Sequence, residues 1–320
     1  MLLRLPDLPM PGFPIQDRLR IFMHPHQLVL LRIKRGNAQH IISKQVIACH
    51  AGEPGTSKAE ASWMPAVSTL ATVLRDKSWH GAKPQLVLSN HFVRYALIPW
   101  HDSLGNHAER QAYLRHSFQL AYGDSAKGWD LRMSDNGVQR ASVASGIEQS
   151  LLQHVQQAFE AAGLSTSEIY PHLMVAMNQV RQQTDHAAYW FALVESGRLC
   201  ISLIQDGHWR SVKACAAAED IAGQITALIE RESVLCGINT TGWPLLMYWP
   251  GHTADSEMQI SNRPLPHPPL PNRPLLNRKV EWIRPLNLGR LEADVGDGDR
   301  LDATSQLAGA SSSLELAMWA

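Results

Sequence analysis

The sequence lacks several features that would assign it to a common functional class. Its 29 lysines and arginines are matched by 29 aspartates and glutamates, so it offers no basic excess for nucleic acid. It has only four cysteines, with no CxxC pair, and no run of 18 apolar residues. These absences predict a cytoplasmic protein that neither inserts directly into a membrane nor binds nucleic acid.

The first 17 residues also lack the pattern of a secretory signal. They are apolar, but Arg4, Asp7 and four prolines interrupt them, and no small-residue cleavage site follows. We therefore expect residues 1–17 to form an N-terminal extension rather than a leader.

The length of 320 residues is enough for one large domain or two ordinary ones. Apolar residues make up 45% of the chain, which is enough to form a hydrophobic core. Short alternating or apolar runs predict strands over 20–24, 27–36, 40–50, 84–100, 138–144, 191–216 and 243–251. Apolar residues at helical spacing predict helices over 63–79, 104–123, 145–163, 171–182 and 218–237. The third helix begins with Ser145 and Glu148 in the spacing of a capping box, and Gly163 ends it.

Three stretches carry a resemblance to a known group of proteins. They are "LVLSNHFVRYALIPW", "VASGIEQSLLQHVQQAFEAAGLSTSEIYPHLMVAMNQV" and "YWFALVESGRLCISLIQDGHWRSVKACA". Two successive units of meandering strands and a helix are the layout of the actin, hexokinase and Hsp70 superfamily. Within that superfamily, residues 18–251 resemble the pilus-assembly protein PilM, the cytoplasmic domain of the type II secretion protein GspL, and their relative MshI.

The resemblance implies an α/β, two-lobed actin-like (ribonuclease H-like) fold with mixed five-stranded sheets. The predicted domains are the 1–17 extension, a first lobe over 18–187, a second lobe over 188–251 and a proline-rich, low-complexity tail over 252–320. The first lobe is expected to contain an inserted strand–helix subdomain around 84–135. Proline, leucine and small polar residues predict that the tail is disordered.

The two turns that hold nucleotide phosphates in this superfamily are degenerate here. The resemblance implies an Asp-x-Gly in each, but the first turn, "FMHPHQL", has neither residue, and Pro25 removes an amide donor. The second turn keeps only a remnant, Glu195, Ser196 and Gly197. We therefore predict no catalytic residues and no cofactor. The alternative is an ATP-binding switch or ATPase that holds Mg-ATP through this remnant.

Three other chemistries are weaker interpretations. His24 and His26 are two residues apart, but no convincing further ligand lies nearby, so no metal is predicted. Ser89 or Ser145, one of several histidines, and Asp102 or Asp124 could be combined into a Ser-His-Asp hydrolase triad. The sequence, however, has no G-x-S-x-G nucleophile elbow. A vacant cleft between the lobes leaves a small-molecule sensor as a third possibility.

The resemblance also implies a partner, because PilM receives a short cytoplasmic peptide of an inner-membrane protein. The strand ending in Pro99-Trp100 is the candidate docking edge, with aromatic and arginine side chains typical of interface anchors. The candidates are Phe92, Arg94, Tyr95, Pro99 and Trp100. The predicted function is a non-catalytic scaffold at the cytoplasmic face of an inner-membrane type IV pilus-like or type II secretion-like machine, attached through its partner. Homo-oligomerisation is left open.

Overall fold

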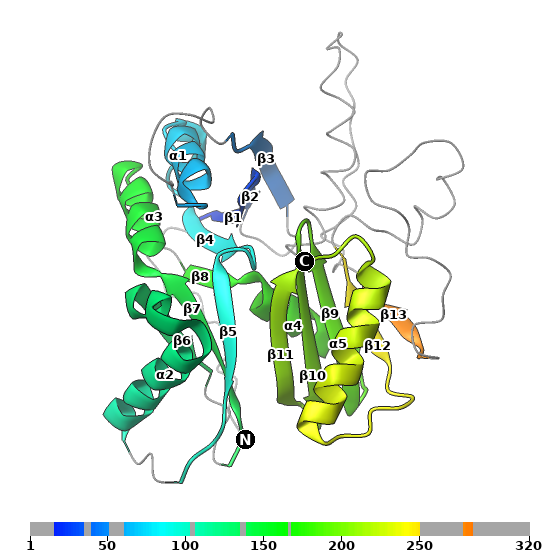
Figure 1. Cartoon of the computed structure of the whole chain (residues 1–320). Coiled ribbons are helices and arrows are strands. Elements are labelled where there is room, and N and C mark those ends of the chain that lie inside the picture. The colour runs from blue at the N-terminus through cyan, green and yellow to red at the C-terminus, as the bar shows by residue number, and fades with distance from the viewer. Residues whose placement is uncertain are drawn as a thin grey trace, which may run out of the picture.

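The computed structural model describes residues 16–34, 40–50, 61–102, 106–134, 139–165, 168–249 and 278–283. Of the predicted N-terminal extension, residues 1–15 lie outside the described residues. The described residues form two five-stranded sheets and one three-stranded sheet, with helices packed on them (Figure 1). Among the described residues, no helix combines the length and the apolar character needed to cross a membrane.

The first large sheet has the strand order β3-β2-β1-β4-β8. Its strands are β1 (Arg18–His24), β2 (Gln27–Lys34), β3 (His40–Ala48), β4 (Lys83–Leu88) and β8 (Glu168–Pro171). β1, β2 and β3 form an antiparallel meander, whereas β4 runs parallel to β1 and β8 parallel to β4. Two helices, α1 (Met64–Val73) and α3 (Gln149–Ala161), pack against each other beside this sheet (Figure 1).

The second large sheet has the order β11-β10-β9-β12-β13. Its elements are β9 (Ala188–Glu195), β10 (Arg198–Gln205), β11 (His208–Ala216), β12 (Leu245–Tyr248), β13 (Val280–Trp282) and the helix α5 (Ile221–Cys236). Alternate residues of β9 face opposite sides. Trp190 and Val194 pack with α5, whereas Phe191 and Leu193 belong to the core shared with the first lobe. Because both faces are buried, the strand reads as a continuous apolar run.

The helix α4 (His172–Gln183) connects the two lobes. Its buried residues Leu173, Met177 and Val180 belong to one continuous cluster that extends from α1 to Phe191 of β9. In Figure 1, α4 lies between the two large sheets. The interior of the first lobe therefore continues into the second lobe without a break.

A small sheet, in the order β5-β7-β6, forms a separate layer with α2 (His107–Tyr122). Its strands are β5 (Val93–Ile98), β6 (Trp129–Met133) and β7 (Ser142–Glu148); the 3-10 turns η1 (Lys77–Trp79) and η2 (Gly123–Gly128) precede β4 and β6. Phe118 and Trp129 pack directly on Gly146, where an added Cβ would lie 2.9 Å from each ring. Glycine is therefore required at this contact.

Two details differ from the sequence-based boundaries. The subdomain predicted around 84–135 begins at β5, since β4 belongs to the first large sheet, and it includes β7 up to Glu148. The predicted cap at Ser145 is wrong, because Ser145 lies inside β7 between Tyr95 and Arg132 of its neighbours, and α3 begins only at Gln149. Pairing on both sides of β7 outweighs local capping.

The tail predicted from residue 252 contributes one strand to the fold. β13 pairs in parallel with β12, and the backbone N–H of Ile283 donates to the carbonyl of Met247 at 2.9 Å. The second lobe therefore includes 278–283 and does not end at 251. The rest of the predicted tail lies outside the described residues.

Candidate functional site

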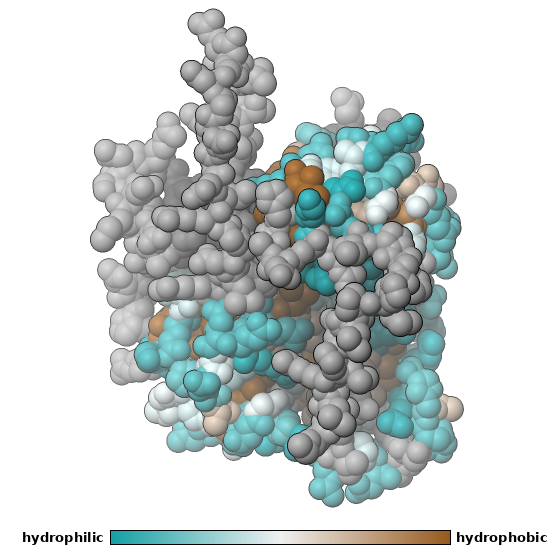
Figure 2. All heavy atoms as spheres, turned by 180° about the vertical axis from the view of Figure 1, so that it is seen from behind, coloured by the Kyte–Doolittle hydropathy of each residue, from teal (hydrophilic) through white to brown (hydrophobic). Residues whose placement is uncertain are grey.

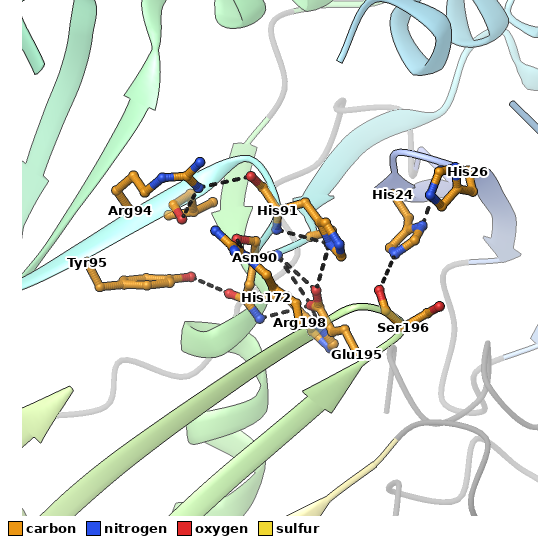
Figure 3. A network of polar contacts seen from close by, with 12 residues as sticks. His24, His26, Asn90, His91, Arg94, Tyr95, His172, Glu195, Ser196 and Arg198 are labelled. Atoms are coloured by element: carbon orange, nitrogen blue, oxygen red, sulfur yellow. Dashed lines mark hydrogen bonds and ion pairs between the residues drawn. The ribbon is translucent and has the colours of Figure 1, made fainter. Parts of the chain in front are cut away.

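Three turns meet where the two lobes face each other (Figure 3). The β1–β2 turn brings His24 to the β9–β10 turn, and His24 Nε2 lies 3.3 Å from the carbonyl oxygen of Ser196. The β4–β5 turn, predicted at Asn90-His91, places the His91 ring 4.7 Å from the His24 ring. A Cβ on Gly197, whose φ is 79°, would lie 3.3 Å from His91 Nε2. The two turns expected to hold phosphates are thus in direct contact.

The carboxylate of Glu195 is the centre of this contact. It ends β9, and its side chain is only 4% exposed. It accepts hydrogen bonds from Ser89 Oγ at 2.6 Å, from the backbone N–H of Asn90 at 3.1 Å and from Asn90 Nδ2 at 2.9 Å. His172 Nδ1, at the start of α4, forms an ion pair with the same group. The second lobe therefore anchors to the first through one buried anion.

Further contacts hold Asn90 in place. Tyr95 Oη donates to Asn90 Oδ1 at 2.6 Å, and Arg198 Nε donates to the Asn90 carbonyl at 3.4 Å. Arg94 Nη1 donates to the carbonyl of His91 at 3.0 Å. Both ends of the Asn90 amide are used, since its oxygen accepts from Tyr95 and its nitrogen donates to Glu195. Such a network orients each member through its neighbours.

Burial and hydrogen bonding set the ionisation of this site. Burial by itself raises the pKa of Glu195, but the charge of His172 and the hydrogen bonds from His172, His91 and Ser89 outweigh it and hold that pKa below its ordinary value. Burial, assisted by the charge of His91, lowers the pKa of His24 to about 4. At neutral pH, Glu195 is therefore ionised and His24 is neutral.

The neutral form of His24 fits its two hydrogen bonds. Its Nε2–H donates to the carbonyl of Ser196, and its Nδ1 accepts the backbone N–H of His26 at 3.2 Å. A proton on Nδ1 would break the second of these bonds. His24 therefore acts as an uncharged connector between the turns.

The structure places the other chemical candidates apart. Among the described residues, no group of three histidine, cysteine or acidic side chains is arranged to hold a metal ion. Ser89 lies 2.9 Å from His91 Nδ1, but it is fully buried and donates its hydroxyl to Glu195. Asp102 accepts from Trp100 Nε1, and Asp124 pairs with Lys127. Ser145, the other candidate nucleophile, lies inside a paired strand. The serines and aspartates considered for a hydrolase triad therefore do not come together.

The candidate docking residues divide into two sets. Phe92 and Tyr95 are buried, and Arg94 is held by backbone carbonyls of its own turn. β5 pairs with β7 on one side, and its other side approaches β11 (Figure 1). Pro99 is exposed and Trp100 is half-buried. Of the five candidates, Pro99 and Trp100 at the exit of the strand therefore offer accessible apolar surface to a partner.

Sequence reasoning identified Glu195 but missed the groups that bind it. Ser89, Asn90 and His172 lie 106, 105 and 23 residues away along the chain. The one available signal was the Ser-Asn-His turn directly after β4, which the fold places opposite the β9–β10 turn. No sequence pattern indicated the role of His172, because it is simply the first residue of a helix.

Comparisons with known proteins find similarity in structure alone. No family model and no curated protein matches the sequence. A PilM-PilN type IV pilus biogenesis complex contains a similar chain, with TM-score 0.57, 12% identity and coverage of 95% of this chain and 98% of that one. The cytoplasmic domain of EpsL, an inner-membrane component of the type II secretion system of Vibrio cholerae, has TM-score 0.52, 10% identity and coverage of 83% and 89%.

A Bacteroides thetaiotaomicron protein with an actin-like ATPase fold and unknown function is also similar, with TM-score 0.51 and 10% identity over 76% of this chain and 85% of that one. The two-lobed actin-like fold expected from the sequence is confirmed, and the structural neighbours include both PilM and a GspL-type domain. At these identities the likeness establishes the fold.

Proposed function

We propose that this protein is a non-catalytic, actin-like scaffold at the cytoplasmic face of an inner-membrane machine of the type IV pilus or type II secretion kind. It binds the cytoplasmic segment of a membrane protein and reaches the membrane through that partner. The single observation that carries the proposal is the Glu195 network, which uses the donors at the inter-lobe contact within the protein itself.

The chemistry of the network disfavours a nucleotide. A phosphate needs preorganised N–H or O–H donors and a neutralising cation. Here the hydroxyl of Ser89, the backbone N–H of Asn90 and the side-chain amide of Asn90 already donate to Glu195. An incoming phosphate would have to displace an ionised carboxylate or remain beside it in a region of low dielectric, where like charges repel strongly.

The structural neighbours supply the direction of the proposal. The PilM structure is a complex with PilN in type IV pilus biogenesis, and EpsL is an inner-membrane component of a secretion system. Although its own side chains fill the two turns expected to hold phosphates, the protein can still bind a partner on its outer surface. The exit of β5 at Pro99 and Trp100 is the surface that we assign to the partner.

Replacing Trp100 with alanine is expected to reduce recruitment of the protein to the membrane fraction of its native cells by about tenfold or more, as for an aromatic interface anchor. Leu120→Ala is the matched control, because Leu120 is 75% exposed on α2 and lines no pocket near Trp100. Melting temperatures of both variants separate lost docking from lost folding. Normal fractionation of a folded Trp100→Ala protein would remove this surface from the proposal.

Mg-ATP at millimolar concentration is expected to leave the melting temperature unchanged. A ligand that binds the native state raises stability with the logarithm of its concentration over its dissociation constant, so even weak binding is detectable. Magnesium chloride with sodium sulfate at equal ionic strength is the control. A clear upward shift with Mg-ATP alone, lost in Gly197→Ala, would instead establish the ATP-binding alternative.

A further inference from the structure

A pocket of about 320 Å³ is lined by residues next to the exit of β5; this end of β5 lies at the lower end of the small sheet in Figure 1. The pocket lies between the end of β5, the first two turns of α2 and the adjoining ends of β6 and β7. Apolar and aromatic side chains form much of its lining, namely Ile98, Pro99, Trp100, Tyr113 and Met133. This volume is at the small end of ligand sites, so it suits one or two side chains rather than a folded domain.

The remaining lining of this pocket is polar and includes two arginines. Arg110 and Arg140 both line it, together with His101 and His107, and no aspartate or glutamate among the described residues does. The neighbouring carboxylate of Asp102 already accepts the indole N–H of Trp100 at 2.8 Å. In a chain with zero net charge, this local excess of arginine is a specific feature of the surface.

Arg110, which lines the pocket, also has one unsatisfied donor. Its Nε is buried and has no hydrogen-bond partner among the described residues. A buried donor left unpaired costs about 1–3 kcal/mol, and more in a charged group. A carboxylate that entered the pocket would pair with the guanidinium of Arg110, because guanidinium groups bind carboxylates through two parallel N–H groups.

A second depression continues this arginine-containing surface. It is lined by Arg140, which both depressions share, and by His208, Trp209 and Arg210 of β11. In the part of the chain that the structure describes, no acidic residue lines this depression either. Arginines thus extend from α2, past the residues just before β7, to β11 of the second lobe, and the half-buried Trp100 lies beside them. This strip is longer than one side chain and suits an extended segment.

From this charge and shape we propose that the pocket bounded by Trp100, Arg110 and Arg140 binds a short acidic peptide segment of the membrane partner, in which an apolar or aromatic side chain neighbours a carboxylate. The inference rests on the proposed function, since it names the chemistry of the segment that the scaffold holds. The apolar side chain packs against Trp100 and Met133, and the carboxylate pairs with Arg110. A small inorganic anion could pair with Arg110 but would make no contact with the apolar side chains of the pocket.

The test uses the full chain and three fluorescein-labelled peptides in an anisotropy titration. The probe is Gly-Ser-Leu-Glu-Phe-Glu-Ser-Gly; one companion has glutamine for both glutamates, and the other has serine for leucine and phenylalanine. The probe is expected to bind at least tenfold more tightly than either companion. Equal binding by the glutamine companion would overturn the proposal, because the pocket would then not recognise a carboxylate.

Matched variants locate the binding. Arg110→Gln is expected to weaken probe binding at least tenfold, whereas Arg115→Gln, an exposed change of the same charge on the same helix, is expected to leave it unchanged. Wild-type affinity in Arg110→Gln would overturn the assignment. The chain itself has an acidic segment at 291–302. If neutralising Glu292, Asp294, Asp297 and Asp299 raises probe affinity tenfold, that segment and not a partner is the occupant, and the proposal fails.

Membrane recruitment separates this inference from the function on which it rests. If Arg110→Gln loses the probe but fractionates with membranes as the wild type does, the partner docks elsewhere, and only the further inference fails. If the wild type binds the probe but is absent from membranes, the proposed function fails and the peptide chemistry of the pocket stands. Loss of both in Arg110→Gln, with both kept in Arg115→Gln, supports the two together.

Discussion

Replacing Glu195 with leucine is expected to lower the free energy of unfolding by about 3–5 kcal/mol, the usual effect of removing one partner of a buried ion pair. The substitution leaves His172 without its anion and leaves the donors of Ser89 and Asn90 unpaired in a buried region. For a folded part of this size, the melting temperature should fall by roughly 10 °C. Chemical denaturation at pH 7 measures the change directly.

Two further variants make this result specific to the buried network. Glu195→Gln retains the shape and part of the hydrogen bonding, so it should lie between leucine and the wild type. Glu168→Gln removes an exposed carboxylate that pairs with Lys83 at 2.7 Å, and it should cost at most about 1 kcal/mol. A leucine variant as stable as Glu168→Gln would contradict the structural role of Glu195.

Lowering the pH from 7 to 5 is expected to destabilise the protein through His24. The unfolded imidazole has its ordinary pKa of 6.5, whereas burial lowers the pKa in the folded protein to about 4. Between these values the unfolded chain binds a proton that the native state excludes, so stability is full above pH 6.5 and falls as the pH decreases towards 4. At pH 5 the loss amounts to about 2 kcal/mol.

The groups that face His24 are His26 in its own turn, His91 in the β4–β5 turn, and Glu195 and Ser196 in the β9–β10 turn. Glu195 does not contribute in this range, because its pKa lies below its ordinary value of 4.5. In His24→Gln, the amide can still donate to Ser196, but it does not titrate. Denaturation of this variant at pH 7 and pH 5 should therefore show a smaller loss than the wild type shows; an equal loss would assign the acid sensitivity to other groups.

Local patterns were sufficient for the β9–β10–β11 meander of the second large sheet and for α2. The run from 191 to 209 alternates apolar residues around turns at Ser196-Gly197 and Asp206-Gly207, and both turns are present. α2 begins at the capping box of Asn106 and Glu109 and ends at Gly123, within the range expected from its sequence. In these elements the local preference agrees with the tertiary pairing.

The small sheet and the site depend on contacts that no local pattern contains. β7 pairs with β5 and β6 across long separations, which turned a plausible helix cap at Ser145 into the middle of a strand. β13 lies beyond a proline-rich stretch and carries only three residues. Glu195 could be recognised as a misplaced acid in a degenerate turn, but its partners come from two other segments, which only the fold brings together.

The continuous core through α4 has a mechanical consequence. A protein whose two lobes open and close needs a joint whose two sides can separate. Here Phe191 and Leu193 share one interior with the first lobe, and Glu195 links the rims of both sheets. We therefore expect a pull on one lobe to move both lobes together, because separating them would expose this buried interior to water.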